Sequence, residues 1–116
     1  MAVTATAGVE LSLAAGRLLK VLGDRTRLAL LRRLSEGPAT VSELTAALGS
    51  PPQSRISNHL GCLRWCELVT SEKVGRNVIY RLANPGVFAL IELACEVAAP
   101  HAEHLASCTR IGPDWV

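Results

Sequence analysis

The sequence predicts a mainly α-helical domain that carries one small β-hairpin. Apolar residues recur every three or four positions along most of the chain, which is the helical period. The exception is residues 69–83, VTSEKVGRNVIYRLA, where β-branched residues alternate around Gly75, Arg76 and Asn77, as in two strands joined by a turn. The 116 residues are 49% hydrophobic and 19% charged, which is typical of a single globular domain. We therefore expect one domain over residues 1–116, with a flexible C-terminal tail.

Three helices are expected before the middle of the chain. Residues 9–22 present a broad apolar face, and Asp24 is a suitable N-cap for a second helix that stops at Gly37-Pro38. Thr40 and Glu43 have the spacing of a capping box, so a short third helix begins there. A last helix is expected from Pro85 to about residue 98, with an interruption at Pro100 that is followed by the segment HAEHLASC and a loosely ordered tail.

Residues 54–68, SRISNHLGCLRWCEL, are predicted to form the helix that carries the function. At about 100° per residue, Ile56, Leu60 and Leu63 form a narrow apolar stripe that should pack on a core. Ser54, Asn58, Gly61 and Trp65 cluster on roughly the opposite side, so that side is free to touch a partner. A short helix, a turn and this second helix form a helix-turn-helix pattern, and a hairpin directly after it would form a wing.

This pattern predicts binding of double-stranded DNA, with the second helix in the major groove and the wing on the backbone or minor groove. Asn58 is suited to adenine, and Arg55 to guanine or phosphate. His59 lies on the core side of the helix, where a packed histidine is the common alternative. Arg25 and Arg27 are expected to serve the junction of the first two helices. The candidate DNA contacts are Ser54, Arg55, Ser57, Asn58, His59, Lys73 and Arg76.

The distribution of charge and the composition favour binding of a nucleic acid and argue against several other classes of function. Residues 51–82 hold five basic and two acidic side chains, whereas residues 83–116 hold one and four, so positive charge gathers around the predicted reading helix. Only four aromatic residues are present, too few for single-strand binding by base stacking.

The sequence has no catalytic triad, phosphate-binding glycine loop or H-E-x-x-H motif, so we do not expect an enzyme. Without a membrane-spanning run or a signal peptide, we expect a cytoplasmic protein with reduced cysteines.

Cys62 and Cys66 are four residues apart on the predicted reading helix, so their side chains lie one above the other. Thiolates bind soft or borderline ions, and a sensor needs a third ligand besides this pair. Cys95 lies beside apolar residues of the last helix and is expected to pack there, which leaves Cys108 in the tail as the better candidate. The pair could instead fill the edge of the core, or act as a redox switch with one of these two cysteines.

Three motifs together resemble the ArsR/SmtB family of metal-responsive winged-helix repressors. They are D-x-T-R-x-x-x-L from Asp24, S-x-x-S-x-H-L-x-x-L from Ser54 and G-R-x-x-x-Y-x-L from Gly75. The resemblance covers residues 14–98 and implies a homodimer, formed through the first and last helices, that binds its operator without metal and releases it with metal. Within this family, the pair Cys62 and Cys66 resembles the metal ligands of the CmtR-type branch, which senses cadmium and lead. That branch also has a distal cysteine, and Cys108 matches its position best.

Other branches of the family fit the residues less well. The segment before Glu43 has no cysteine, and the last helix lacks the usual Asp-x-His pair, although Glu92, Glu96, His101 and His104 keep a zinc or nickel site open as an alternative. Three sulfurs suit Cd(II), Pb(II) or As(III), and a further histidine or water would favour Zn(II). Binding is expected to pull the thiol pair toward the tail cysteine, to reorient or stiffen the reading helix, and to lower its affinity for DNA.

Overall fold

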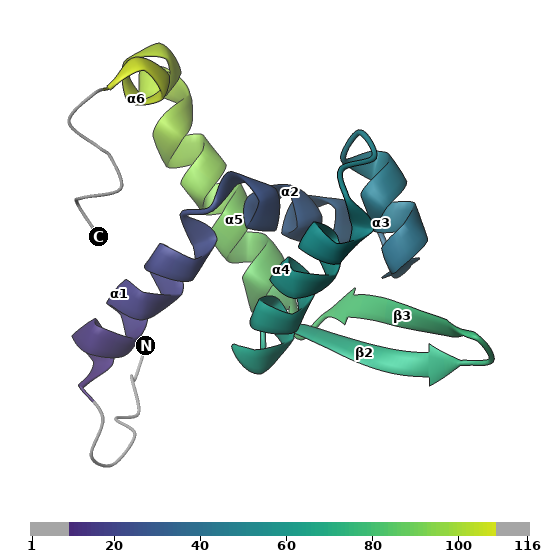
Figure 1. The fold of residues 1–116 in the computed structure, drawn as a ribbon. Helices are drawn as coiled ribbons and strands as arrows, with labels where there is room; N and C mark the ends of the chain where they lie inside the picture. Colours follow the sequence, from purple (N-terminus) through teal and green to yellow (C-terminus); the bar gives the residue numbers. More distant parts are fainter. Residues whose placement is uncertain (1–9, 109–116) are drawn as a thin grey trace.

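The computed structural model describes residues 10–108 (Figure 1). Helices make up most of this part, and the strands form one antiparallel sheet, so the prediction of a mainly helical domain with a small β-hairpin is confirmed. None of the helices in this part is long and apolar enough to cross a membrane. In chain order the elements are α1 (Leu11–Leu22), α2 (Arg25–Leu34), β1 (Ala39–Thr40), α3 (Val41–Ala47), α4 (Gln53–Trp65), β2 (Val69–Val74), β3 (Asn77–Leu82), α5 (Pro85–Ala98), the 3-10 helix η1 (Ala99–His101) and α6 (Ala102–Ser107).

The helix starts follow the capping residues predicted from the sequence. The Asp24 side chain accepts a hydrogen bond from the Arg27 N–H at 3.0 Å and caps α2. At α3, the Glu43 N–H donates to the Thr40 hydroxyl at 3.2 Å, and the Glu43 carboxylate accepts from the Thr40 N–H at 2.9 Å. This capping box is confirmed.

The end of α4 differs from the prediction, because the helix stops at Trp65 rather than continuing to Leu68. Glu67 has a φ of 62°, which reverses the chain, and the Leu68 N–H donates to the Leu63 carbonyl at 3.0 Å. This reversal lets Leu68 join the core. It also makes Cys66 the C-cap of α4 rather than a residue inside the helix.

The sheet has three strands in the order β1-β3-β2, one more than the predicted hairpin. The hairpin pairs Val69 with Leu82 through to Val74 with Asn77, and Gly75 begins its two-residue turn with a φ of 62°. The unpredicted strand β1 pairs Ala39 with Tyr80 and Thr40 with Ile79. It ties the start of α3 to the hairpin.

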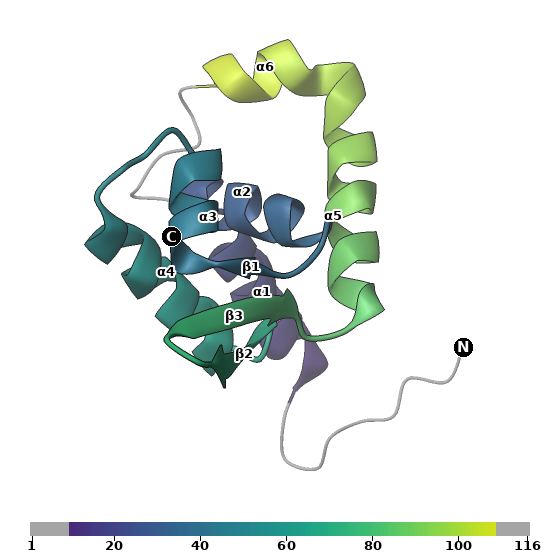
Figure 2. The same cartoon turned by 90° about the vertical axis from the view of Figure 1, so that its right-hand side faces the viewer.

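Buried side chains from α1 to α5 and from strands β1 and β2 meet in one core beneath α4. Figure 2 shows α2 and α3 between α4 and α5, with the sheet alongside. The Ile56, Leu60 and Leu63 side chains are 0% exposed, so the predicted apolar stripe of α4 is confirmed. The buried core consists of Leu22, Leu30, Leu31, Leu34, Ala39, Leu44, Ile56, Leu60, Leu63, Leu68, Val69, Val87 and Ile91.

The chain remains helical after Pro100, where the sequence predicted an interruption of the last helix. Pro100 lies in the first turn of η1, a position where a missing N–H breaks no helical hydrogen bond, and α6 follows directly. Residues 109–116 of the predicted tail and Val9 of the predicted first helix lie outside the described residues.

Candidate nucleic-acid interface and thiol site

The solvent side of α4 presents most of the predicted DNA contacts. The side chains of Ser54, Arg55, Ser57 and Asn58 are all exposed, on the side of the helix away from its buried stripe. Pro52 precedes the helix, and no side chain makes a capping hydrogen bond to its first turn. This arrangement suits insertion of the helix into a groove of DNA.

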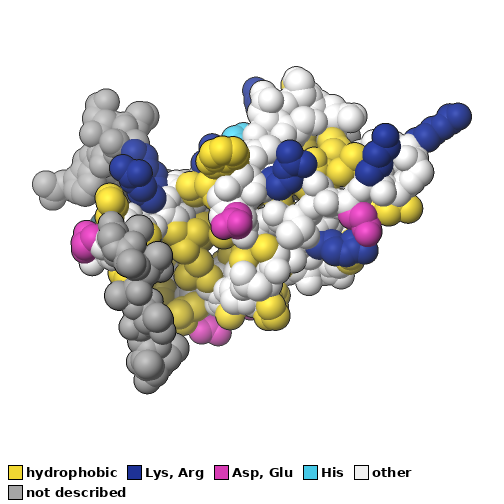
Figure 3. All heavy atoms as spheres, turned by 90° about the horizontal axis from the view of Figure 1, so that it is seen from below, with side chains coloured by type: hydrophobic (Ala, Val, Ile, Leu, Met, Phe, Trp, Pro, Cys, Tyr) yellow, Lys and Arg dark blue, Asp and Glu magenta, His cyan; other side chains and the backbone are white. Residues whose placement is uncertain are grey.

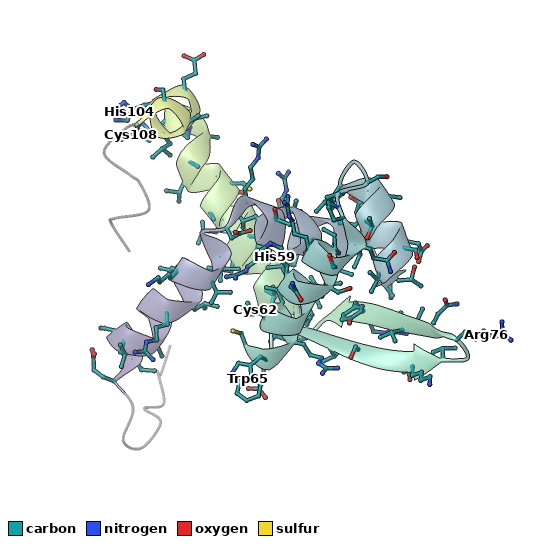
Figure 4. All side chains as sticks on the ribbon, in the orientation of Figure 1. His59, Cys62, Trp65, Arg76, His104 and Cys108 are labelled. Atoms are coloured by element: carbon teal, nitrogen blue, oxygen red, sulfur yellow. The ribbon has the colours of Figure 1, made fainter. Side chains whose placement is uncertain are left out.

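His59 occupies a different environment, at the contact between α4 and α2. Its side chain is half-buried, and its Nδ1 accepts a hydrogen bond from Arg27 Nε at 3.2 Å (Figure 4). Arg27 also donates to the carbonyl oxygen of Val21 at the end of α1, at 3.4 Å. Arg27 therefore serves the helix junction, as predicted, and holds His59 as well, whereas Arg25 is exposed and makes no such contact.

The Arg27–His59 contact was not predicted. The two residues are 32 positions apart, and neither helix contains a periodic signal that links them. Because Nδ1 accepts, the geometry assigns the proton of a neutral imidazole to Nε2. Nε2 is therefore the ring nitrogen of His59 that could contact DNA.

The β2–β3 hairpin extends away from the body of the domain and carries the remaining candidates. Arg76 lies at its tip (Figure 4), and Lys73 is exposed three residues earlier. The space-filling view shows Lys and Arg side chains along one rim of the molecule, over α4 and the hairpin (Figure 3). At the base of the hairpin, Arg64 of α4 donates to the Ser71 hydroxyl at 3.1 Å and so links the two elements.

The predicted thiol pair lies at the C-terminal end of α4. Cys62 is half-buried and Cys66 is exposed, and the Cys66 N–H donates to the Cys62 carbonyl at 3.0 Å, so the helical spacing holds through both residues. Desolvation at this helix end raises the pKa of the Cys66 thiol, and the neighbouring Cys62 thiol raises that pKa further. The Arg27 guanidinium acts in the opposite direction. Cys66 is therefore a thiol at neutral pH, and an ion must displace its proton.

The structure does not bring a third cysteine to this pair. Cys108 lies beside His104 at the end of α6, well away from Cys62 (Figure 4). Within residues 10–108, no group of three Cys, His, Asp or Glu side chains is close enough to hold a metal ion. Cys95 is exposed on α5, so the prediction that it packs as a small apolar residue is wrong for the single chain. Its exposure follows from the position of α5 at the edge of the domain (Figure 2).

Comparison with known proteins decides the family. Residues 24–71, from the cap of α2 to β2, match the bacterial regulatory protein arsR family. A probable mercury resistance operon repressor from Streptomyces lividans is 38% identical over 95 residues, which are 82% of this chain and 75% of that protein. The chain belongs to the ArsR/SmtB family of metal-responsive repressors. The predicted family is therefore confirmed, and this family consists of DNA-binding regulators rather than enzymes.

Two further relatives of this ArsR/SmtB chain bear on its branch and fold. CmtR of Mycobacterium tuberculosis is 44% identical over 71 residues, 61% of this chain and 59% of that one, so the match leaves much of both outside. A homodimeric winged helix-turn-helix DNA-binding domain from Mycobacterium bovis has a TM-score of 0.72 and 30% identity, covering 90% of this chain and 95% of that one. The winged helix-turn-helix fold is confirmed.

Proposed function

We propose that this repressor is a homodimer that binds operator DNA through α4 and the hairpin and is released by a thiophilic ion. The position of the thiol pair supports this proposal most directly. Cys62 lies in α4 with Asn58 and the other exposed polar residues, and Cys66 is the C-cap of the same helix. An ion held by that helix and an operator read by it would then influence one another.

Exposed apolar side chains support a dimer formed through α1 and α5. Leu19 is 58% exposed, Leu93 is 57% exposed and Val97 is 67% exposed, which is costly for a monomer. Between α1, α2 and α5 lies an apolar hollow of about 160 Å³, and hydrophobic side chains are visible beside α1 in Figure 3. Val97→Glu should therefore yield monomers in sedimentation analysis; a variant that remains dimeric would exclude this face as the interface.

The ion site is proposed to contain Cys62 and Cys66 of one subunit and Cys108 of the partner subunit. Two stacked thiols supply soft ligands, and the distance to Cys108 within the single chain supports a contribution from the other subunit. Three sulfurs favour Cd(II) or Pb(II), the ions that the resemblance to the CmtR-type branch implies, and As(III) has the same preference. Zn(II) would require a fourth ligand such as a histidine or water.

Mercury is a second candidate ion. The Streptomyces relative is named for mercury resistance, and the two stacked thiols within one chain offer a soft dithiolate site without Cys108. Cys108→Ser separates the two candidates. It should abolish release by cadmium, whereas release by mercury should persist if the pair alone holds that ion.

The test combines metal binding with release of DNA. An operator is first selected from a random-sequence duplex library, and its affinity is then measured by fluorescence anisotropy with and without cadmium. Cys62→Ser and Cys66→Ser should bind the operator normally and fail to release it, while the control Cys95→Ser should behave as the wild type. If the cysteine variants are still released by cadmium, the thiol site is elsewhere.

The proposal also requires reciprocity. If cadmium weakens operator binding, the operator must weaken cadmium binding by the same factor, typically about 5- to 150-fold in regulatory systems. Trp65 is 88% exposed and adjacent to Cys66, so its fluorescence offers a readout of ion binding. Equal cadmium affinities with and without the operator would exclude the mechanism.

A further inference from the structure

A groove of about 930 Å³ opens between the solvent side of α2, the turn from α3 to α4 and the first turn of α4. Its lining includes four arginines and a single acidic residue, Glu36. Only Arg55 is among the predicted DNA contacts. The four arginines are Arg25, Arg32 and Arg33 of α2 and Arg55 of α4.

None of these four arginines forms an ion pair with a carboxylate of residues 10–108. The ion pair found in this part of the chain is that between Arg81 and Glu72, on the hairpin, at 3.9 Å. Arg33 is engaged, because it donates to the Gly37 carbonyl at 3.3 Å. Like charges around one groove repel each other, so a bound anion would stabilise this arrangement.

The helix dipole explains the positions of only two of these four arginines, Arg32 and Arg33. Basic residues in the last turn of α2, such as Arg32, are favourable because that end of the helix is negative. Arg25 is the first residue of α2 and Arg55 the third of α4, where the dipole disfavours positive charge. The Asp24 carboxylate caps α2, whereas α4 has neither a side-chain cap nor an acidic residue in its first turn. An anion at the groove would favour both the arginines and the uncapped start of α4.

We propose that this groove binds the sugar-phosphate backbone of double-stranded DNA beside the bases that α4 reads. The inference rests on the proposed binding of DNA. Arg55 lines the groove and is exposed on α4 next to Ser54, so backbone that leaves the reading helix passes directly along the groove. Arg25 and Arg32 are seven residues apart on one side of α2, about 10 Å along the helix, so they contact different phosphates.

The double variant Arg25→Gln/Arg32→Gln tests the inference with a fluorescein-labelled duplex of random sequence, since backbone contacts do not depend on sequence. Affinity is measured by anisotropy over a range of sodium chloride concentrations. The slope of log affinity against log salt should decrease by about 0.9 per lost phosphate contact, so by about 1.8, or about 60-fold in affinity near 0.1 M salt. The control Arg17→Gln/Lys20→Gln removes the same charge from exposed positions on α1 and should keep the wild-type slope.

Two measurements decide whether the groove holds DNA backbone. An unchanged salt slope in the groove variant, or an equal decrease in the α1 control, would overturn the inference. Thermal unfolding in inorganic phosphate tests for a small anion. If phosphate stabilises the wild type but not the groove variant, and the two proteins have the same salt slope for DNA binding, the groove binds a small anion instead. If the wild type shows no salt-dependent binding to any duplex, the proposed function itself fails, and the inference fails with it.

Discussion

The number of protons that cadmium displaces when it binds tests how many thiols form the proposed site. Thiolates bind metal, and free cysteine thiols are protonated at neutral pH, so each sulfur ligand must lose one proton. Because the pKa of Cys66 is raised above its ordinary value, this residue remains a thiol throughout the neutral range. Each displaced proton makes the apparent affinity rise about tenfold per pH unit. Affinity must therefore increase with pH below the thiol pKa values.

The size of the pH effect gives the number of sulfur ligands. Cys62 and Cys66 alone predict an increase of about 100-fold per pH unit, because two protons leave. With Cys108 of the partner subunit as a third ligand, the increase is about 1,000-fold per pH unit. These two values differ enough to be distinguished in a single titration series.

Competition against a chelator of known affinity, repeated at several pH values, measures this dependence. Cys62→Ser and Cys66→Ser should each reduce the pH slope by one proton, and Cys108→Ser should do so only in the three-thiolate site. Cys95→Ser is the matched control and should leave the slope unchanged. A cadmium affinity that does not change with pH would refute the reasoning, and so would a Cys66→Ser variant that keeps the wild-type pH slope. If Cys95→Ser reduces the slope and Cys108→Ser does not, Cys95 is the third ligand.

Four other substitutions test the fold and the interface. Thr40→Val removes the hydroxyl that caps α3 and should lower the free energy of unfolding by about 1 kcal/mol in urea denaturation. The Thr40 contacts lower the pKa of Glu43, so the wild type loses stability as the pH falls through that lowered pKa, and the variant should lose less. Glu67→Gly should raise the free energy of unfolding by about 1 kcal/mol, because glycine tolerates a φ of 62°. Arg27→Met should lower it by about 1 kcal/mol and shift the ring-nitrogen resonances of His59 in NMR spectra; unchanged resonances would contradict the hydrogen bond. Asn58→Ala should weaken binding to the selected operator by about 1 to 3 kcal/mol while leaving binding to random duplex unchanged.

The features that the sequence predicted well depend on contacts within a few residues. The capping box joins Thr40 to Glu43, and the stripe of Ile56, Leu60 and Leu63 needs only the helical period. The stacking of Cys62 on Cys66 is local in the same way. Such contacts are fixed once the helix forms, so they can be read before the fold is known.

The features that the sequence did not predict depend on where distant segments meet. Strand β1 contains only two residues, and it exists because Thr40 lies opposite Ile79, almost forty positions away. The bond between Arg27 and His59 likewise depends on how α2 packs on α4. The sequence names Cys108 as the better candidate for a third sulfur ligand, but whether it reaches Cys62 and Cys66 depends on the direction of α6 and on how two subunits assemble.

The burial of α4 also indicates how an ion could release DNA. Ile56, Leu60 and Leu63 are 0% exposed, and full burial of such side chains contributes about 1.5 to 3 kcal/mol each, or about 5 to 9 kcal/mol together. A typical coupling energy of about 1 to 3 kcal/mol cannot expose that stripe. Of the two effects expected from the sequence, reorientation of α4 on its core is therefore energetically unfavourable, whereas stiffening of the helix exposes nothing.

A shift between subunits requires no such exposure. An ion that joins Cys62 of one subunit to Cys108 of the other would change the spacing of the two reading helices, and operator half-sites demand a fixed spacing. Amide hydrogen exchange distinguishes the two mechanisms, since it reports local opening. Cadmium should leave protection along the buried turns of α4 unchanged while altering it on α1 and α5; a loss of protection confined to α4 would show that the helix itself moves.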